Sequence, residues 1–207
     1  MPSLDDLKKR IASVKSTQKI TKAMKMVAAA KLRKAQEAAE QSRPYADNME
    51  NLMDSISRGY IQTDSSRNLL TGNDEDKTIL LVLFTSERGL CGGFNSQVSK
   101  ALREKIIELQ NQNKTVKVLC VGKKGYDIIK RQYGDLIVEM IDLSSVKSIQ
   151  YEDAKNISDK IIKMYFDAEF DRCLIFYNKF KSVISQIPTE QQVIPAEKSQ
   201  DETNEDQ

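Results

Sequence analysis

The sequence predicts an α/β protein in which a long amino-terminal helix of the coiled-coil type precedes a domain with a mostly parallel sheet. Residues 4–58 contain no glycine and only one proline, and their apolar residues recur with a helical period. From residue 78 onward, short apolar runs alternate with amphipathic segments. The domain boundaries that we predict are residues 1–58 for the helix, 59–77 for a linker, 78–195 for the α/β domain and 196–207 for an acidic, disordered tail.

The helix has clear signals at both ends. Ser3 is a suitable N-cap, and Asp5 and Asp6 stand where the positive end of the helix dipole favours negative charge. Helical signals continue to about residue 57, with an expected interruption and kink at Pro44. A continuous helix of this extent would span roughly 80 Å, which is longer than a helix inside a compact domain.

The apolar residues of this helix form two stripes when they are placed at about 100° per residue. The first stripe contains Leu4, Leu7, Ile11 and Val14. The second contains Ile20, Met24, Val27, Ala28, Ala35, Ala38, Met49, Met53 and Ile56. One stripe gives way to the other between residues 16 and 19. Such a surface favours packing against another helix along nearly the whole length.

The other side of the helix is strongly basic. Residues 7–36 contain ten Lys or Arg and no acid. The face opposite the second stripe carries Lys8, Lys15, Lys19, Lys22 and Arg33, with Met26 among them. A charged helix face is ordinarily just solvated, but this charge density together with an apolar stripe favours a partner.

Three kinds of partner fit a basic helix to different degrees. Nucleic acid would use the charge to displace counterions, but no aromatic residue precedes residue 43 to stack on bases. A membrane surface would favour bulky apolar residues opposite the lysines, and much of the stripe is alanine and methionine. An acidic protein partner therefore fits better than either.

The second half of the chain has the alternating pattern of a Rossmann-like domain with a mostly parallel sheet covered on both faces. The predicted strands are residues 78–84, 116–121, 136–141 and 173–177. The predicted helices are residues 96–112, 124–133 and 151–166. Residues 182–194 are less regular, and we expect an added edge strand broken by Pro188.

A glycine-rich segment, TSERGLCGGFN (residues 85–95), directly follows the first predicted strand. This is where dinucleotide folds bind phosphate, but the spacing of Gly89, Gly92 and Gly93 does not match G-x-G-x-x-G, and no Walker motif is present. A tight strand-to-helix turn or a subunit contact is the better interpretation. Cys91 would need a base to act as a nucleophile, so a small residue in a packed turn is preferred over a catalytic thiol.

Composition excludes several kinds of chemistry. The chain has no histidine, which removes Ser-His-Asp and Cys-His pairs and most zinc sites. Its three cysteines are odd in number and widely spaced, which predicts free thiols in a reducing compartment. No apolar run approaches the roughly 20 residues of a membrane span, and the amino terminus lacks a secretory core. Asp142, Glu152 and Asp153 are too scattered to suggest a carboxylate pair, and we expect neither a cofactor nor a metal.

Four segments resemble the gamma subunit of the bacterial-type rotary ATP synthase. They are KITKAMKMVAAAKLRKAQ (residues 19–36), SRPYA (42–46), TSERGLCGGFN (85–95) and YNKFKSVISQIPTEQQVIP (177–195), and the match is collinear from Ser3 to about Pro195. The resemblance implies a non-catalytic rotor-stalk subunit that couples proton-driven rotation to ATP synthesis in a ring of alpha and beta subunits. It implies shaft contacts at Lys15, Lys19, Lys22, Met24, Lys25, Met26 and Arg33. It also implies a contact turn at Arg88, Gly89, Cys91, Gly92 and Gly93.

The resemblance further implies which partners and which compartment to expect. The partners are the alpha and beta subunits, the epsilon subunit and the membrane rotor ring of c subunits, without nucleic acid. The location is the cytoplasmic face of the bacterial plasma membrane, reached through the complex. The family's long carboxy-terminal helix is not found in this sequence, so we expect the apolar stripe to lack its partner from the same chain. Two rivals stay open: a nucleic-acid-binding module that uses the basic helix, and a nucleotide-dependent enzyme built on the α/β domain.

Overall fold

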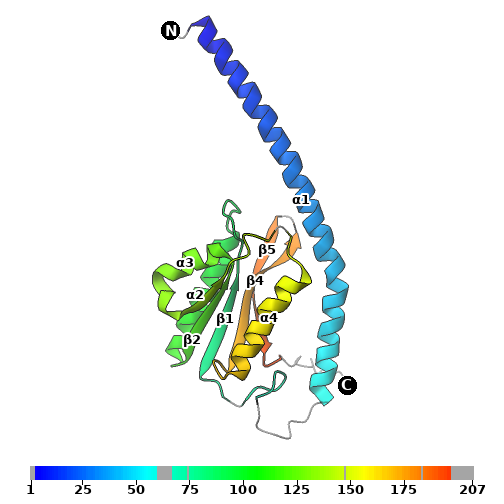
Figure 1. Cartoon of the computed structure of the whole chain (residues 1–207), viewed down its shortest axis with the longest axis vertical. Coiled ribbons are helices and arrows are strands. Elements are labelled where there is room, and N and C mark those ends of the chain that lie inside the picture. Colours follow the sequence, from blue (N-terminus) through cyan, green and yellow to red (C-terminus); the bar gives the residue numbers. More distant parts are fainter. Residues whose placement is uncertain (1–2, 60–66, 74, 147, 183, 197–207) are drawn as a thin grey trace, which may run out of the picture. The chain divides into compact units, whose positions relative to one another are not determined.

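The computed structural model describes residues 3–59, 67–73, 75–146, 148–182 and 184–196 (Figure 1). The chain divides into two compact units, Met1–Ser55 and Ile56–Gln207. The first unit is formed by a single helix, and the second contains a sheet with its covering helices. The predicted fold class, a long amino-terminal helix with a mostly parallel α/β domain, is confirmed.

The long helix, α1, runs from Leu4 to Gly59 and contains 56 residues. Its first turn is closed by a reciprocal pair of hydrogen bonds. The Asp6 backbone N–H donates to Ser3 Oγ at 3.2 Å, and the Ser3 N–H donates to Asp6 Oδ2 at 3.3 Å. The predicted N-cap is therefore confirmed.

Pro44 lies inside α1 and does not end it. A proline removes one intrahelical donor, here the one that would bond the Glu40 carbonyl four residues earlier. Glu40 is exposed, so water can solvate the carbonyl that loses its partner. The expected interruption is thus absent, although Figure 1 shows that the axis of α1 changes direction partway along its length.

The second unit has one five-stranded sheet with the order β3-β2-β1-β4-β5. The β1 strand pairs in parallel with β2 and β4, β2 pairs in parallel with β3, and β5 is antiparallel to β4. The strands are β1 (Thr78–Phe84), β2 (Thr115–Val121), β3 (Ile137–Ile141), β4 (Arg172–Ser182) and β5 (Ser185–Ile194). The helices are α2 (Phe94–Asn111), α3 (Lys123–Tyr133), the short 3-10 helix η1 (Gly134–Leu136) and α4 (Tyr151–Phe166).

The carboxy-terminal hairpin differs from the prediction. The β4 strand continues to Ser182 instead of ending at residue 177, and β5 passes through Pro188 without a break. Pro188 stands opposite Asn178 in the register. Because β5 is an edge strand with one neighbour, a proline can point its nitrogen away from the ladder and remove no hydrogen bond.

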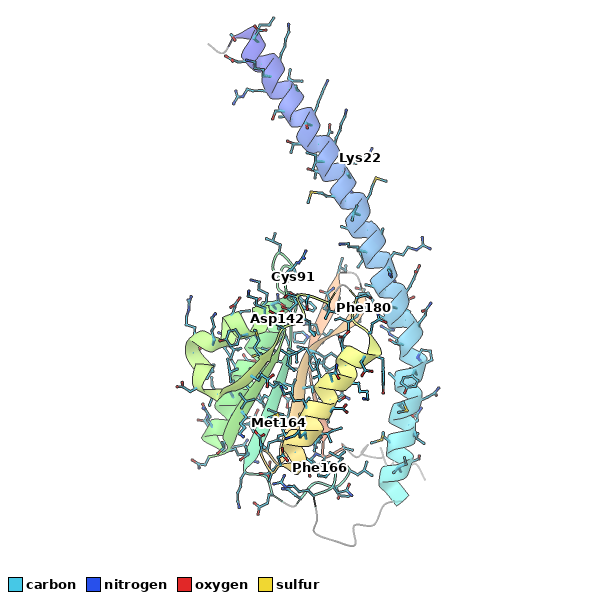
Figure 2. The ribbon with its side chains drawn as sticks, in the orientation of Figure 1. Lys22, Cys91, Asp142, Met164, Phe166 and Phe180 are labelled. Carbon is cyan, nitrogen blue, oxygen red and sulfur yellow. The ribbon has the colours of Figure 1, made fainter. Side chains whose placement is uncertain are left out.

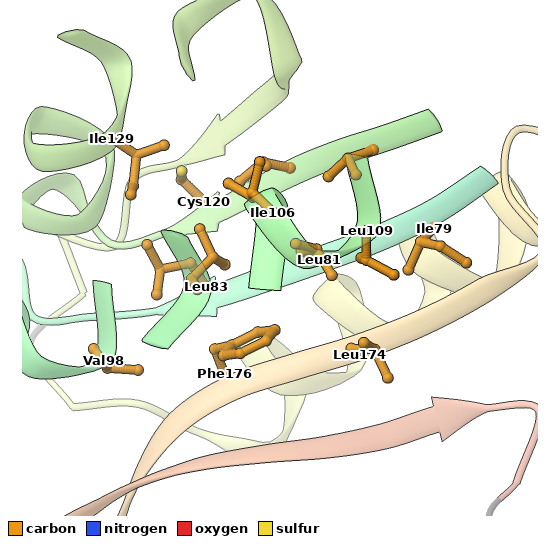
Figure 3. Close-up of a cluster of buried hydrophobic side chains, with 13 residues drawn as sticks. Ile79, Leu81, Leu83, Val98, Ile106, Leu109, Cys120, Ile129, Leu174 and Phe176 are labelled. Atoms are coloured by element: carbon orange, nitrogen blue, oxygen red, sulfur yellow. The ribbon is translucent and has the colours of Figure 1, made fainter. Parts of the chain in front are cut away.

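The core lies on both faces of the sheet because β1 is apolar at every position from Ile79 to Phe84. Ile79, Leu81 and Leu83 face a cluster that includes residues of α2 and α3 (Figure 3). Leu80 and Val82 face the opposite side, where residues of α4 pack. A strand that is buried on both faces has a nearly continuous run of apolar residues, which is why residues 78–84 could be predicted to form a strand.

Asp171 is a buried carboxylate that connects the loop before β4 to the segment that leads into β1. It is 7% exposed, and its Oδ1 accepts from Asn73 Nδ2 at 2.9 Å and Arg67 Nη2 at 3.3 Å. Its Oδ2 accepts from the backbone N–H groups of Lys77 at 3.0 Å and Thr78 at 2.9 Å. Burial by itself raises the pKa of Asp171, but these donors together lower it below its ordinary value.

Replacing Asp171 by Asn should lower the free energy of unfolding by about 2–3 kcal/mol. The amide NH₂ of the asparagine would face N–H donors that now bond the carboxylate, and Arg67 would lose its counter-charge. Leaving a buried polar or charged group without its partner lowers the stability of the folded state. Urea unfolding at pH 7 followed by circular dichroism measures the change. Coincident unfolding curves for the two chains would contradict this role of Asp171.

The same carboxylate predicts a dependence of stability on pH. Its pKa is lower in the folded chain than in the unfolded chain, so its contribution is present above the unfolded pKa of about 4. The contribution disappears as the pH falls from there through the folded pKa. We expect Asp171→Asn to lose less stability than the natural chain over this acidic range, measured by urea midpoints at successive pH values.

Candidate partner-binding surfaces

The first candidate surface comprises the two apolar stripes of α1, together called the apolar stripe below, which no described residue buries. None of its large side chains is buried, and the smallest exposed fraction among them is 38%, at Met53. The exposed members are Leu4, Leu7, Ile11, Val14, Ile20, Met24, Val27, Met49, Met53 and Ile56. A contiguous apolar surface of this length marks a site of interaction with another chain or segment.

The basic residues of α1 are exposed as well. Lys15, Lys19 and Lys22 follow one another along the same side of the helix, and Figure 2 shows Lys22 projecting from it. Arg33 continues this row, and its Nε bonds Glu37 at 2.8 Å. Both partners of that pair are exposed, so it adds little stability and leaves the row basic. Lys25 is also exposed, about 60° around the helix from Lys22.

The two methionines of the KAMKMV segment do not share a face. Met24 and Met26 are equally exposed, at 66% each, but two residues along a helix turn about 200°. Met24 therefore belongs to the apolar stripe, whereas Met26 lies among the lysines. A partner on one side of α1 contacts only one of them.

The second candidate surface is the turn between β1 and α2, residues 85–93. Its base is set by a close approach of backbones. Gly122 has a φ of +102°, and a Cβ there would lie 2.2 Å from the Thr85 carbonyl oxygen. Thr85 Oγ1 also accepts from the Gly125 N–H at 2.8 Å, so the end of β1 is fixed against the start of α3. Only glycine fits at position 122.

Glu87 joins three loops at the carboxyl end of the parallel strands. Its Oε2 accepts from the Lys123 N–H at 3.1 Å, and its Oε1 accepts from the Leu143 N–H at 2.8 Å. The loops that follow β1, β2 and β3 are thereby held together. Glu87 was not among the predicted site residues, although an acid three residues after a buried strand was a usable signal.

The conformation of the turn is maintained from inside by Asn95, which is 7% exposed. Its Oδ1 accepts from the Ser86 N–H at 3.0 Å, and its Nδ2 donates to Cys91 Sγ at 3.1 Å. Ser86 Oγ donates to the Arg88 carbonyl at 2.6 Å. Cys91 is thus an exposed member of a hydrogen-bonded turn.

The tip of the turn is unusual because it presents an apolar side chain to solvent. Leu90 is fully exposed and has a φ of +63°, a conformation that leucine rarely adopts. Ile149, Tyr151 and Ile184 are also strongly exposed, on the segments that follow β3 and β4. Since the parallel strands share one direction, these segments lie at the same end of the sheet, where Figure 2 shows Cys91 and Asp142. We call this the carboxyl-end surface.

The structure places every residue that was predicted for the turn on this surface. All five are exposed: Arg88, Gly89, Cys91, Gly92 and Gly93. Gly92 has a φ of +60°, so the turn uses its conformational freedom. Their contact with a partner stays a prediction.

The isolated carboxylates have local structural partners. Asp142 Oδ1 accepts from the Ser144 N–H at 2.7 Å, and hydrogen bonding by the Ser144 side chain and N–H lowers the pKa of Asp142. Asp153 Oδ2 accepts from the Gln150 N–H at 2.8 Å in a capping box that begins α4. Both side chains therefore close turns.

Among the described residues, no group of Cys, Asp or Glu has an arrangement that could hold a metal ion. Among the same residues, no helix has the length and apolar content that crossing a membrane requires. All three cysteines are free, as predicted, and burial raises the pKa of Cys120 and of Cys173 to about 12.

A long exposed helix with one apolar and one basic side, joined to an α/β domain with an apolar loop surface, defines a subunit that works by contact with other chains.

Comparison with known proteins identifies the family. The family model described as ATP synthase matches residues 3–207. The chain is 57% identical over 196 residues to an ATP synthase gamma chain of Sinorhizobium medicae, covering 95% of this chain and 67% of that one. It is 53% identical over 204 residues to that of Pelagibacter ubique, covering 99% and 70%. The chain belongs to the ATP synthase gamma-chain family.

Solved structures agree with this assignment. The central stalk and c-ring structure of the Tetrahymena thermophila mitochondrial ATP synthase contains a similar chain, with 27% identity and a TM-score of 0.65. The similarity covers 85% of this chain and 72% of that one. The rotor of the Euglena gracilis mitochondrial ATP synthase shares the fold, with 20% identity, a TM-score of 0.55 and coverage of 90% and 61%.

Alkylation of the native chain should modify one cysteine of three. Cys91 is exposed, whereas the buried thiols at Cys120 and Cys173 keep their protons at pH 8 and so lack the reactive thiolate. Mass spectrometry after treatment with iodoacetamide identifies the modified residues, and treatment in 8 M urea is the control in which all three should react. Rapid native modification of Cys120 or Cys173 would contradict the packing described.

Proposed function

We propose that the chain is the central rotor-stalk subunit of a proton-translocating ATP synthase and that it couples rotation to ATP synthesis in subunits other than itself. As a gamma-chain family member it is a non-catalytic subunit of that complex. The observation that supports the coupling role most directly is the uncovered surface of α1, apolar on one side and basic on the other. A helix built for its own domain would bury the apolar side instead.

The proposed partners divide between the two sides of α1. A second helix covers the apolar stripe, where each buried Ile, Leu or Met side chain contributes about 1.5 kcal/mol or more. The alpha and beta subunits surround the helix, and acidic loops of the beta subunits meet Lys15, Lys19, Lys22, Lys25 and Arg33. Met24 and Met26 give each side an unbranched, polarizable contact.

The basic row suits a rotating contact. Exposed ion pairs contribute at most about 1 kcal/mol each, so an acidic partner is attracted without being fixed at one angle. Buried ion pairs would hold the partner much more rigidly. Attraction without such pairs allows the helix to pass from one neighbour to the next.

The α/β domain supplies the remaining proposed contacts. The epsilon subunit and the c-ring bind to this domain, and the turn at residues 88–93 is a contact surface that presents Leu90. The complex places the chain peripherally on the cytoplasmic face of a bacterial plasma membrane. The bacterial origin of the curated gamma chains described above supports this location.

Reversing the charge of the basic row should uncouple the enzyme. In an ATP synthase assembled with this gamma sequence, Lys22→Glu, Lys25→Glu and Arg33→Glu together repel the acidic loops at positions where the natural side chains attract them. We expect ATP-driven proton pumping in vesicles to fall at least fivefold relative to ATP hydrolysis. Unchanged pumping per ATP would refute the role of this row.

The matched control changes the same net charge elsewhere. Lys100→Glu, Lys130→Glu and Arg131→Glu lie on the exposed faces of α2 and α3, outside both candidate surfaces. Pumping per ATP should stay at the natural level in this variant. A loss equal to that of the first variant would mean that net charge, and not the α1 surface, is responsible.

Substituting Leu90 should weaken the binding of partner subunits without destabilising the folded chain. Asparagine tolerates a positive φ better than leucine does, so Leu90→Asn should not lower the melting temperature. The loss of about 1.5 kcal/mol of apolar burial should weaken binding to partner subunits about tenfold. Titration with isolated alpha, beta and epsilon subunits measures it, with Ile107→Asn on α2 as the exposed apolar control. Equal affinities for the natural chain and Leu90→Asn would exclude Leu90 from the contact.

A further inference from the structure

The chain enters and leaves the α/β domain at one place. The incoming segment, residues 67–73, precedes β1, and the outgoing segment, residues 194–196, begins at the last residue of β5. The two segments are directly bonded, because the Ala196 N–H donates to the Leu69 carbonyl oxygen at 3.0 Å. Residues about 127 positions apart in the chain are thus adjacent in space.

The two segments also pack together. Asn68 and Gly72 close a tight turn through two backbone hydrogen bonds of 3.0 and 2.8 Å. Gly72 has a φ of +86°, and a Cβ there would lie 3.3 Å from Pro195 Cγ, so the ring of Pro195 lies against the turn. Leu69 from this turn and Ile194 belong to the same hydrophobic cluster.

Arg67 fastens the incoming segment to the loop before β4. Its Nη1 donates to the Phe170 carbonyl at 2.8 Å and to the Tyr165 carbonyl at 3.3 Å, and its Nη2 donates to Asp171. The guanidinium lies 5.3 Å from the centre of the Tyr165 ring. Tyr165 in turn donates its hydroxyl hydrogen to the Asn68 carbonyl at 3.1 Å.

Without these contacts, the outgoing end would be mechanically weak. The β5 strand is an edge strand paired only with β4, and the pairing is antiparallel with Ile194 opposite Cys173. A pull on the chain after Ile194 would therefore separate the ladder one pair at a time from its end. Antiparallel hydrogen bonds lie perpendicular to the strands, so a pull across the ladder at this end loads one pair after another instead of all pairs together.

We propose that the incoming segment, the outgoing segment, Arg67, Tyr165 and Asp171 form a clamp that carries force between the chain before residue 67 and the chain after residue 196. The clamp then carries the force instead of the β4–β5 ladder, and the α/β domain remains folded. This inference rests on the proposed stalk function, in which the α/β domain is under load as the stalk turns. The clamp itself is a property of the free chain.

Amide hydrogen exchange of the full chain tests whether the two ends depend on each other. Arg67→Met keeps an unbranched side chain over Tyr165 but removes every donor. The Ala196 N–H, bonded to Leu69, should exchange at least tenfold faster in this variant than in the natural chain. Core amides such as that of Val82 should keep their protection, which shows that the domain stays folded. Tyr165→Phe, which loses only the hydrogen bond to the Asn68 carbonyl, should raise the exchange rate of the Ala196 amide to a smaller extent.

The control breaks an ion pair of similar exposure outside the clamp. Lys105→Met removes the 3.0 Å pair between α2 and Glu190 of β5 and should leave the exchange of the Ala196 amide unchanged. An Ala196 amide that is unprotected in the natural chain, or equally protected in Arg67→Met, would overturn the clamp. Equal acceleration in Lys105→Met would overturn it as well, because the effect would then be general loosening.

These outcomes are independent of the proposed function. The exchange is measured without other subunits, so a coupled ATP synthase with an unaffected Ala196 amide refutes the clamp alone. A chain that shows the expected exchange but does not assemble into ATP synthase refutes the stalk role and leaves the clamp in place.

Discussion

The apolar stripe of α1 has no cover, and this constraint governs how the chain can function. A helix of 56 residues with exposed Leu, Ile and Met along one side needs another helix to remove that surface from water. Its basic side repels a second copy of itself and attracts acidic chains instead. Both sides therefore require partners, and the family assignment identifies ATP synthase as the assembly that contains them.

The α/β domain has a different task, which is to hold the loops at both ends of its sheet in place. Glu87 holds three loops at the carboxyl end of the sheet, and Asn95 holds the turn that exposes Leu90. At the opposite end of the sheet, Asp171 holds the start of β1 by accepting hydrogen bonds from two backbone N–H groups. Glu87 and Asp171 each accept from two backbone N–H groups, and Asn95 accepts from one, so these side chains fix the loops by satisfying backbone donors.

The sequence alone predicted those features that depend on nearby residues. The β1 strand was visible as an all-apolar run, and the Ser3 cap as a serine followed by acids. Asp171 could not be assigned a role, because its donors come from residues 67–78, far away in the chain. Pro188 was wrongly expected to break the predicted edge strand, because a proline on an edge strand can point its nitrogen away from the only neighbouring strand and leave the ladder intact.

The most direct test of the stalk role is co-purification with alpha and beta subunits, for this chain and for a version extended by a gamma-type carboxy-terminal helix. If the exposed stripe of α1 is a helix-binding surface, the extended version will assemble with the ring and couple ATP hydrolysis to proton pumping. The unextended chain will assemble less or not at all. If neither version associates with the ring, the stalk role is contradicted, and the surface of α1 must serve another partner.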